Sequence, residues 1–156
     1  MPRRPRTRFG APERSAGFLL WRATLAWQRQ IRAALEPHGL THVQFVLLAS
    51  LWWLEEHDRD PPTQARLAAH AGIDQMMASQ VLRKLEAQGR LDRAADTKDT
   101  RARRLRLTPD GRQLVARALT DVERVDAEYF APVTDRQQTF IDALVALTAD
   151  TSDGNT

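Results

Sequence analysis

The stretch that decides the fold runs from residue 63 to residue 111: TQARLAAHAGIDQMMASQVLRKLEAQGRLDRAADTKDTRARRLRLTPDG. Its first half predicts two short helices. Thr63 is a good cap for the first helix, which Gly72 closes, and Asp74 caps the second helix, which Gly89 stops. Two short helices joined by a tight turn that contains glycine are typical of a helix-turn-helix.

The second half of this stretch predicts a β-hairpin. RLDRAA (90–95) and RRLRLT (103–108) have the composition of short strands, and the loop between them is polar. Five of the nine residues in 98–106 are basic, yet Asp96 and Asp99 lie inside or beside that run. Aspartate suits a hairpin loop because its side chain forms local turns with the backbone. A helix-turn-helix followed directly by a hairpin is a winged helix, and the hairpin is its wing.

Helices are predicted on both sides of this stretch. Residues 17–36 show two apolar lines at helical spacing, which implies burial on two sides of one helix. Residues 41–57, capped by Thr41, are apolar nearly all round and predict the central core helix. Pro109 begins a long helix, where its missing N–H costs little, and 134–149 predict a last helix. The fold class is therefore mainly α with a small β-hairpin wing.

The predicted elements fit one domain with several parts. A length of 156 residues is enough for one core. The core of the chain can cover one apolar side of the first helix, and a partner subunit could cover the other. The expected parts are a flexible basic arm (1–16), dimerisation helices (17–40 and 109–149), a winged-helix DNA-binding lobe (41–108) and a disordered tail (150–156).

Charge is unevenly distributed along the chain. The formal net charge is +3. Residues 1–17 carry five Arg against one Glu, and 62–112 carry eleven basic against six acidic residues. Residues 113–156 carry three Arg against eight acidic residues. A localised basic region suggests a polyanionic partner.

Composition also bounds the compartment and the chemistry. The chain has no cysteine, which excludes disulfides, thiolate metal ligands and cysteine redox sensing. No apolar run is long enough to cross a bilayer, and no secretion signal core follows the basic N-terminus. A cytoplasmic protein without membrane contact is therefore expected.

Over roughly residues 17–148 the chain resembles the MarR family of bacterial transcriptional regulators. The segments TQARLAAHAG, SQVLRKLEAQG and DTKDTRARRLRLTPDG carry the resemblance, together with the flanking helices. The wing matches the family's Asp-x-Arg-Asp-x-Arg pattern at Asp96, Asp99 and Arg101, with Lys98 in place of the first Arg.

The resemblance continues after the wing. The family's Leu-Thr-x-x-Gly is matched by Leu107, Thr108 and Gly111. One departure is Arg90, where the family usually has an apolar residue after the glycine that ends the helix. We expect Leu91 to make the core contact of the strand instead.

The second helix of the helix-turn-helix is the expected recognition helix. Ala78, Leu82 and Leu85 step by 4 and 3 and should face the core. Outward side chains of such a helix reach base edges in the major groove, where Gln suits adenine and Arg suits guanine. The methionines could equally contact a thymine methyl group or fill the core. The expected DNA-contacting residues are Gln75, Met77, Ser79, Gln80, Arg83 and Lys84.

Further DNA contacts are expected beside the recognition helix. Thr63 and Gln64 begin the preceding helix, whose free N–H groups suit a phosphate. Arg103 and Arg104 alternate in side on a strand and cannot both face DNA. The resemblance implies that Arg101 is the wing-tip residue that reaches the minor groove, and Asp99 could hold that guanidinium in a defined direction. The expected wing residues are Lys98, Asp99, Arg101, Arg103 and Arg104.

The resemblance also implies a small effector, often aromatic or phenolic, bound between the dimerisation helices and the DNA-binding lobe. The alternative is that the aromatic rings of the chain are only core or dimer contacts. The candidate pocket residues are Trp21, Trp27, His42, Trp52 and Trp53.

Other chemistry is not expected. Among the four histidines only His38 and His42 lie close in sequence, so no metal site is predicted. No Gly-rich phosphate loop, nucleophile motif or pair of catalytic carboxylates stands out, so neither a cofactor nor an enzyme activity is predicted.

The sequence thus predicts a sequence-specific regulator of transcription that binds double-stranded DNA. We expect a homodimeric repressor of MarR type, bound to a pseudo-palindromic operator and released by a small effector. The rival hypothesis is a winged helix used for protein contact, with DNA binding lost.

Overall fold

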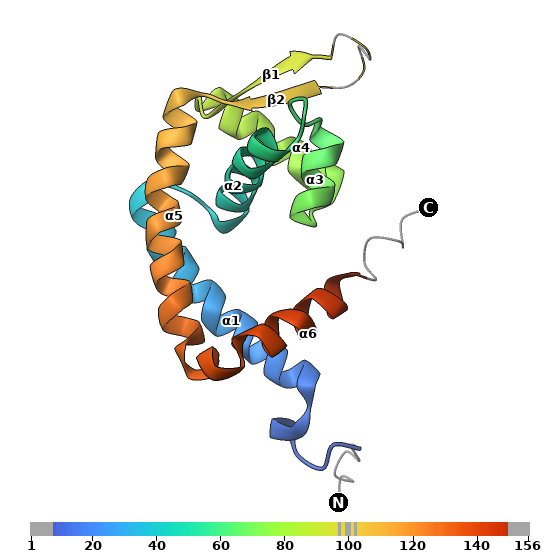
Figure 1. The fold of residues 1–156 in the computed structure, drawn as a ribbon. Coiled ribbons are helices and arrows are strands. Elements are labelled where there is room, and N and C mark those ends of the chain that lie inside the picture. The colour runs from blue at the N-terminus through green and yellow to red at the C-terminus, as the bar shows by residue number, and fades with distance from the viewer. Residues whose placement is uncertain (1–7, 97, 99–100, 102, 150–156) are drawn as a thin grey trace, which may run out of the picture.

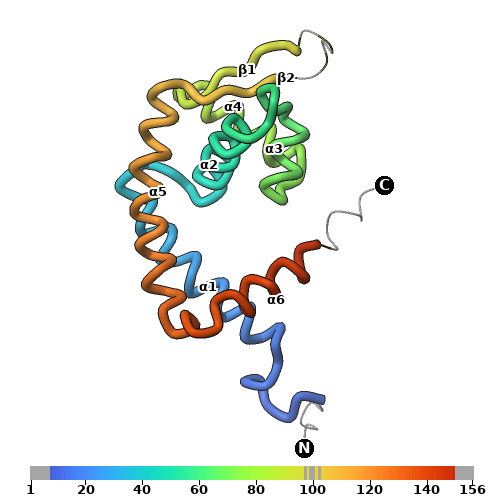
Figure 2. The backbone as a smooth tube through the Cα atoms, in the orientation of Figure 1, coloured from blue at the N-terminus to red at the C-terminus, as the bar shows by residue number. Residues whose placement is uncertain are grey.

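The computed structural model describes residues 8–96, 98, 101 and 103–149. The expected arm is therefore described only from residue 8, and the expected tail (150–156) lies outside the described residues. Figure 1 shows a lobe of short helices with the hairpin at one end, and the long helix α5 connects this lobe to α1 and α6 at the other end. Figure 2 follows the same path of the backbone and shows α1 running beside α5.

The element order agrees with the predicted winged helix. Short 3-10 turns lie at Pro12–Arg14, Glu36–His38 and Ala131–Arg136. The helices and strands are α1 (Ala16–Leu35), α2 (His42–His57), α3 (Gln64–Ala71), α4 (Gln75–Ala87), β1 (Leu91–Ala95), β2 (Arg103–Leu107), α5 (Pro109–Phe130) and α6 (Gln137–Ala149). Among the described residues, no helix is both long enough and apolar enough to cross a membrane.

The predicted helix caps are confirmed. The side chain of Thr41 accepts a hydrogen bond from Gln44 N (3.2 Å), and the Gln44 side chain accepts one from Thr41 N (3.0 Å), which is a full capping box. Thr63 caps α3 and Asp74 caps α4, each by one hydrogen bond that its side chain accepts, from Arg66 N (3.2 Å) and Met77 N (2.8 Å) respectively. Gly72 closes α3 with a φ of 66°, a left-handed conformation that favours glycine.

The core is built around α2, as predicted from its apolar sequence. Its side chains at positions 45, 47, 48, 51 and 54 are buried among α1, α3, α4 and α5. Ile31 and Leu35 of α1 are fully buried against this core. The apolar stripe of α5 is also buried at positions 115, 118, 122 and 125, and the hydroxyl of Tyr129 at its end donates to the carbonyl of Ala23 on α1 (2.8 Å).

The hairpin is antiparallel and packs one face on the core. Leu91 pairs with Leu107 in the register of the two strands, and both side chains are buried together with Leu105. The expectation that Leu91 makes the core contact beside Arg90 is therefore confirmed. The sequence did not predict that residues 62 and 63 would pair with the other edge of β2, where Leu105 N donates to the carbonyl of Pro62 (3.0 Å).

The Leu-Thr-x-x-Gly motif fixes the start of α5 against the turn after α4. Thr108 N donates to the carbonyl of Arg90 (3.2 Å), and the Thr108 hydroxyl donates to the carbonyl of Gly89 (2.7 Å). The same hydroxyl oxygen caps α5 by accepting from Gly111 N (3.0 Å). A Cβ atom on Gly111 would lie 1.8 Å from the carbonyl oxygen of Arg90, so only glycine fits this approach.

The first half of α1 and the whole of α6 contain no buried residue. The N-terminal half of α1 exposes Phe18, Leu20 and Trp21. The prediction of a last helix from residue 134 was wrong at its start. Residues Ala131–Arg136 form a 3-10 turn with Pro132 at its beginning, and α6 starts only at Gln137.

Candidate functional site

The helix-turn-helix presents one face of α4 to solvent and buries the other. Ala78, Leu82 and Leu85 are fully buried, as their spacing predicted. The turn that joins α3 to α4 holds the Gly72 C-cap and the Asp74 N-cap, whose carboxylate accepts from Met77 N (2.8 Å). The direction of α4 is therefore set by packing along its length and by a cap at its beginning.

The outward residues of α4 are polar side chains and two methionines. Met76 is 74% exposed and Met77 is 46% exposed, so the alternative that they fill the core is wrong. Ser79 is half-buried between this face and the core. The other expected contact residues are exposed, namely Gln75, Gln80, Arg83 and Lys84.

The start of α3 lies next to the root of the wing. Thr63 and Gln64 are half-buried, and the Thr63 hydroxyl is already used as the cap of α3 because it accepts from Arg66 N (3.2 Å). Arg66 in turn forms an ion pair with Asp58 (3.3 Å), which fixes the connection between α2 and α3.

Two neighbouring arginines of β2 have different surroundings. The guanidinium of Arg104 pairs with the buried carboxylate of Asp96 (2.7 Å) and donates to the carbonyl of Pro61 (2.6 Å). Arg103, on the opposite side of the strand, is exposed. This agrees with the expectation that the two side chains point in opposite directions.

The remaining candidate residues of the wing are Lys98, Asp99 and Arg101. Asp96 also accepts from Lys98 N (2.8 Å), a local turn of the kind predicted for an aspartate in this loop. Lys98 and Arg101 are exposed. Asp99 lies outside the described residues, so its expected role in orienting Arg101 stays a prediction. In the described part of the wing, Asp96 is paired with Arg104.

The five candidate effector residues do not line one common pocket. Trp21 is 62% exposed on α1. Trp27 donates from Nε1 to Asp126 (2.7 Å), and its ring meets the ring of His42 edge to face at 5.1 Å. Trp52 and Trp53 lie elsewhere, along a separate cavity between α2 and α5.

A cavity of about 360 Å³ lies beside His42, between α1 and the lobe. Gln28 and Arg32 of α1 provide its polar wall. Burial lowers the pKa of His42 below its usual value; Arg32 acts in the same direction, and the nearby Asp126 carboxylate opposes both. The apolar wall and the end next to α4 are formed by Val43, Val46, Ala71 and Ile73.

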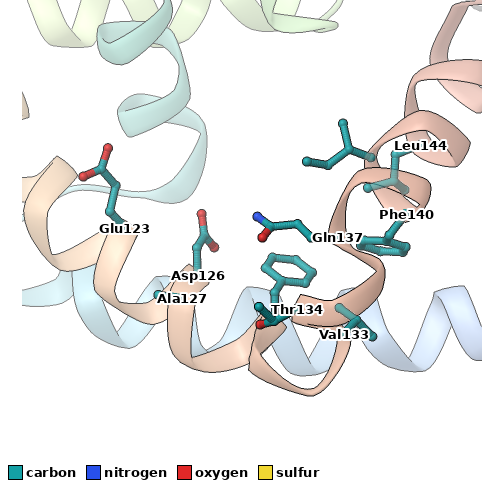
Figure 3. Close-up of a pocket in the computed structure, with 10 residues that line it drawn as sticks. Glu123, Asp126, Ala127, Val133, Thr134, Gln137, Phe140 and Leu144 are labelled. Carbon is teal, nitrogen blue, oxygen red and sulfur yellow. The ribbon is translucent and has the colours of Figure 1, made fainter.

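A second cavity, of about 500 Å³, lies between the end of α5 and α6. Figure 3 shows Phe140 and Leu144 of α6 on one side and Asp126 of α5 on the other, with Gln137 between them. Ile141 also lines this cavity, and its side chain is exposed. This apolar surface lies at the end of the molecule away from the hairpin (Figure 1).

The histidines do not form a metal centre in the described part of the chain. His38 pairs with Asp121 (2.8 Å), and His57 and His70 stack on Trp53. Within the described ranges, no three histidine, aspartate or glutamate side chains come together in an arrangement that could hold a metal ion.

Comparison with known proteins agrees with this architecture. A family model described as an ArnR1-like winged-helix domain matches residues 36–126. The "Uncharacterized HTH-type transcriptional regulator YdcH" of Bacillus subtilis is 40% identical over 141 residues, which cover 90% of this chain and 95% of that protein.

Solved structures of other regulators have a similar fold. The transcriptional repressor CouR, in a structure with a 23-mer DNA duplex, has a TM-score of 0.72 and 25% identity, and the match covers 94% of this chain and 98% of that chain. Bordetella bronchiseptica BpsR, whose structure is described with the regulation of its DNA binding by 6-hydroxynicotinic acid, has a TM-score of 0.74 and 27% identity, covering 90% and 95%.

The helix-turn-helix, the wing and the flanking helices define a winged-helix regulator of transcription. The chain belongs to the MarR family of these regulators, which includes a solved Silicibacter pomeroyi regulator with a TM-score of 0.73 and 25% identity over 90% of this chain and 92% of that chain. This is a family of transcriptional regulators and not a family of enzymes.

Proposed function

We propose that this protein is a homodimeric repressor that binds a pseudo-palindromic operator and is released by a small effector. The observation that carries the DNA-binding proposal is the two-sided construction of α4. Its inner face is fully buried, while Gln80 and Arg83 are exposed one turn apart on its outer face. The DNA duplex bound by CouR supports the same use of this fold.

The wing would add contacts to the phosphate backbone. Lys98, Arg101 and Arg103 are exposed on or near the hairpin, whereas Arg104 is held by Asp96 and contributes mainly to the stability of the wing. Each phosphate neutralised by such a cation releases counterions, so affinity should fall steeply as salt rises. Two wings and two α4 helices would then contact successive grooves of one site.

Dimerisation is proposed through α1, α5 and α6. Phe18, Leu20 and Trp21 of α1 are exposed, as are Phe140 and Ile141 of α6. Several large apolar side chains exposed on each of two helices indicate a protein interface. A second copy of the chain is the occupant that would also supply two DNA-reading helices related by a two-fold axis.

The cavity beside His42 is the proposed effector site. Arg32 and Gln28 can bind a carboxylate, while Val43 and Val46 contact an apolar ring. Ile73, at the end of the cavity, immediately precedes the N-cap of α4. An effector that fits one position of this turn better than another would shift α4 relative to DNA. The 6-hydroxynicotinic acid that regulates BpsR is an aromatic carboxylic acid and supports this chemical class.

The test is DNA binding by the double variant Arg83→Ala, Arg101→Ala. The bound sequence is first selected in vitro from random DNA, and its affinity is then measured by fluorescence anisotropy at several salt concentrations. We expect a loss of about 2–6 kcal/mol in binding free energy and a shallower salt dependence. The control Arg117→Ala removes one arginine charge from an exposed position on α5, outside α4 and the wing, and should bind normally.

An unchanged affinity in the double variant would refute the DNA-binding proposal. Failure of the selection to enrich any sequence would instead favour the rival function, a winged helix that binds another protein. We also propose that the protein acts in the cytoplasm, where bacterial DNA lies, and that it has no catalytic activity.

A further inference from the structure

A third cavity, between α2 and α5, shares no residue with the proposed effector site. Its volume is about 380 Å³, and its walls are almost entirely apolar. Ala49, Val115 and Leu119 form the aliphatic part, and Trp52 and Trp53 form the aromatic part. Trp53 is 47% exposed, so a large apolar ring meets water at the edge of a preformed cavity. Such a combination is typical of a binding site for a small molecule.

The two tryptophans differ in what they contact. Trp53 stacks on His57 (ring centroids 4.1 Å apart) and on His70 of α3 (5.0 Å), with interplanar angles of 11° and 15°. The guanidinium of Arg112 lies over the ring of Trp52, 5.4 Å from its centroid. The Trp52 ring is therefore already in contact with a planar cation, the guanidinium of Arg112.

Among the residues that the structure describes, Glu56 is the only carboxylate that lines this cavity. It accepts from Trp52 Nε1 (3.3 Å) and from Arg112 (3.2 Å), and its side chain is 58% exposed. Arg112 also pairs with Glu55, whose side chain is only 11% exposed. Two glutamates thus share one arginine, and this cluster carries one excess negative charge next to the aromatic wall.

We propose that the cavity between α2 and α5 binds a planar organic cation. The aromatic body of the ligand lies along Trp52 and Trp53, and its positive charge lies next to Glu56. The cation takes the place of Arg112 at Glu56, and Arg112 keeps its pair with the less exposed Glu55. Aromatic walls attract a cation through the ring quadrupole, and the excess carboxylate disfavours an anion of the same shape.

Residues at this cavity contact both parts of the lobe that are proposed to face DNA, the helix-turn-helix and the wing. Trp53 stacks on His70 at the end of α3, just before the turn to α4. Glu55, next to the proposed charge, also accepts from Leu107 N at the end of β2 (2.8 Å). Occupancy should therefore change the affinity for DNA, a consequence that rests on the proposed function of the protein. Binding of the cation itself does not depend on that function.

The experiment uses three probes of similar shape and different charge on the full chain. They are the cation N-methylquinolinium, the neutral 2-methylquinoline and the anion 2-naphthoate, each titrated by calorimetry at mildly alkaline pH. We expect the cation to bind about tenfold more tightly than either other probe. The variant Ala49→Leu fills the cavity and should abolish this binding; circular dichroism checks that it folds.

A second pair of variants tests the charge without touching the core. Glu56→Gln should reduce the preference for the cation to less than about threefold. Asp58→Asn removes the same charge nearby, from a residue that pairs with Arg66 outside the cavity, and should keep the preference. Equal binding of cation and anion by the natural chain would overturn the proposal, as would full cation preference in Glu56→Gln.

Failure of this proposal is distinguishable from failure of the proposed function. Calorimetry is performed without DNA, and DNA affinity is measured separately in the absence of any probe. A chain that binds DNA but shows no preference for the cation would refute only the second ligand site. A chain that prefers the cation but binds no DNA would refute only the repressor.

Discussion

Replacing Gly111 by alanine should destabilise the start of α5, because the new Cβ would lie 1.8 Å from the carbonyl oxygen of Arg90. Contacts of this kind are essentially never shorter than 3.0 Å, so the start of α5 must move away from the turn after α4. Forced overpacking costs about 1–3 kcal/mol. The shift also weakens the Thr108 cap, which adds about 1 kcal/mol.

We therefore expect Gly111→Ala to lose roughly 2–4 kcal/mol of unfolding free energy, or roughly 5–15 °C in melting temperature. Urea unfolding followed by circular dichroism measures this at one fixed protein concentration. Gly17→Ala is the matched control, because no atom lies within 4 Å of its new Cβ and its backbone is helical. It should leave stability unchanged or raise it by up to about 1 kcal/mol. A loss below about 0.5 kcal/mol in Gly111→Ala would show that the Arg90 carbonyl moves freely, and would refute the reasoning.

Two further predictions concern half-buried polar groups, Glu55 and His42. Glu55→Gln weakens the acceptor shared by Leu107 N and Arg112 and should cost about 1–3 kcal/mol in urea unfolding, whereas a cost near zero would mean that water replaces the carboxylate. Burial, the largest cause, lowers the pKa of His42 below its usual 6.5. The unfolded chain therefore binds a proton at His42 more readily than the folded chain. The contribution of neutral His42 to the free energy of unfolding is full above about pH 6.5 and is lost as the pH falls from there toward the folded pKa. In His42→Gln the stability should fall less between about pH 6.5 and pH 5 than in the natural chain, and identical pH profiles would contradict the assignment.

The elements that could be predicted from the sequence are those fixed by neighbouring residues. A cap needs only Thr41, Thr63 or Asp74 and the three residues that follow each, so its signal is local. The buried face of α4 follows in the same way from the spacing of its apolar side chains. The exposed residues on the opposite face were therefore identified correctly as outward-facing.

The parts that could not be predicted depend on residues far apart in the sequence. The carbonyl of Pro61 receives the guanidinium of Arg104, and Trp27 donates to Asp126, yet nothing local in either pair specifies the partner. For the same reason the candidate effector residues were grouped by ring type, and the structure separates His42 from Trp53 into different cavities. Asp96 shows the limit most directly, because its role as the partner of Arg104 requires the strand pairing to be known.

The contact between Arg104 and Pro61 has a consequence for protein engineering. The guanidinium connects the wing to the segment before α3, and Leu105 N donates to the carbonyl of Pro62 in the same segment. A chimaera that exchanged only the hairpin would give these carbonyls a foreign partner. Because Leu107 N also donates to Glu55, the smallest portable cassette that keeps all three contacts runs from residue 55 to residue 111. It carries the end of α2, the segment before α3, the helix-turn-helix, the wing and the glycine at the start of α5.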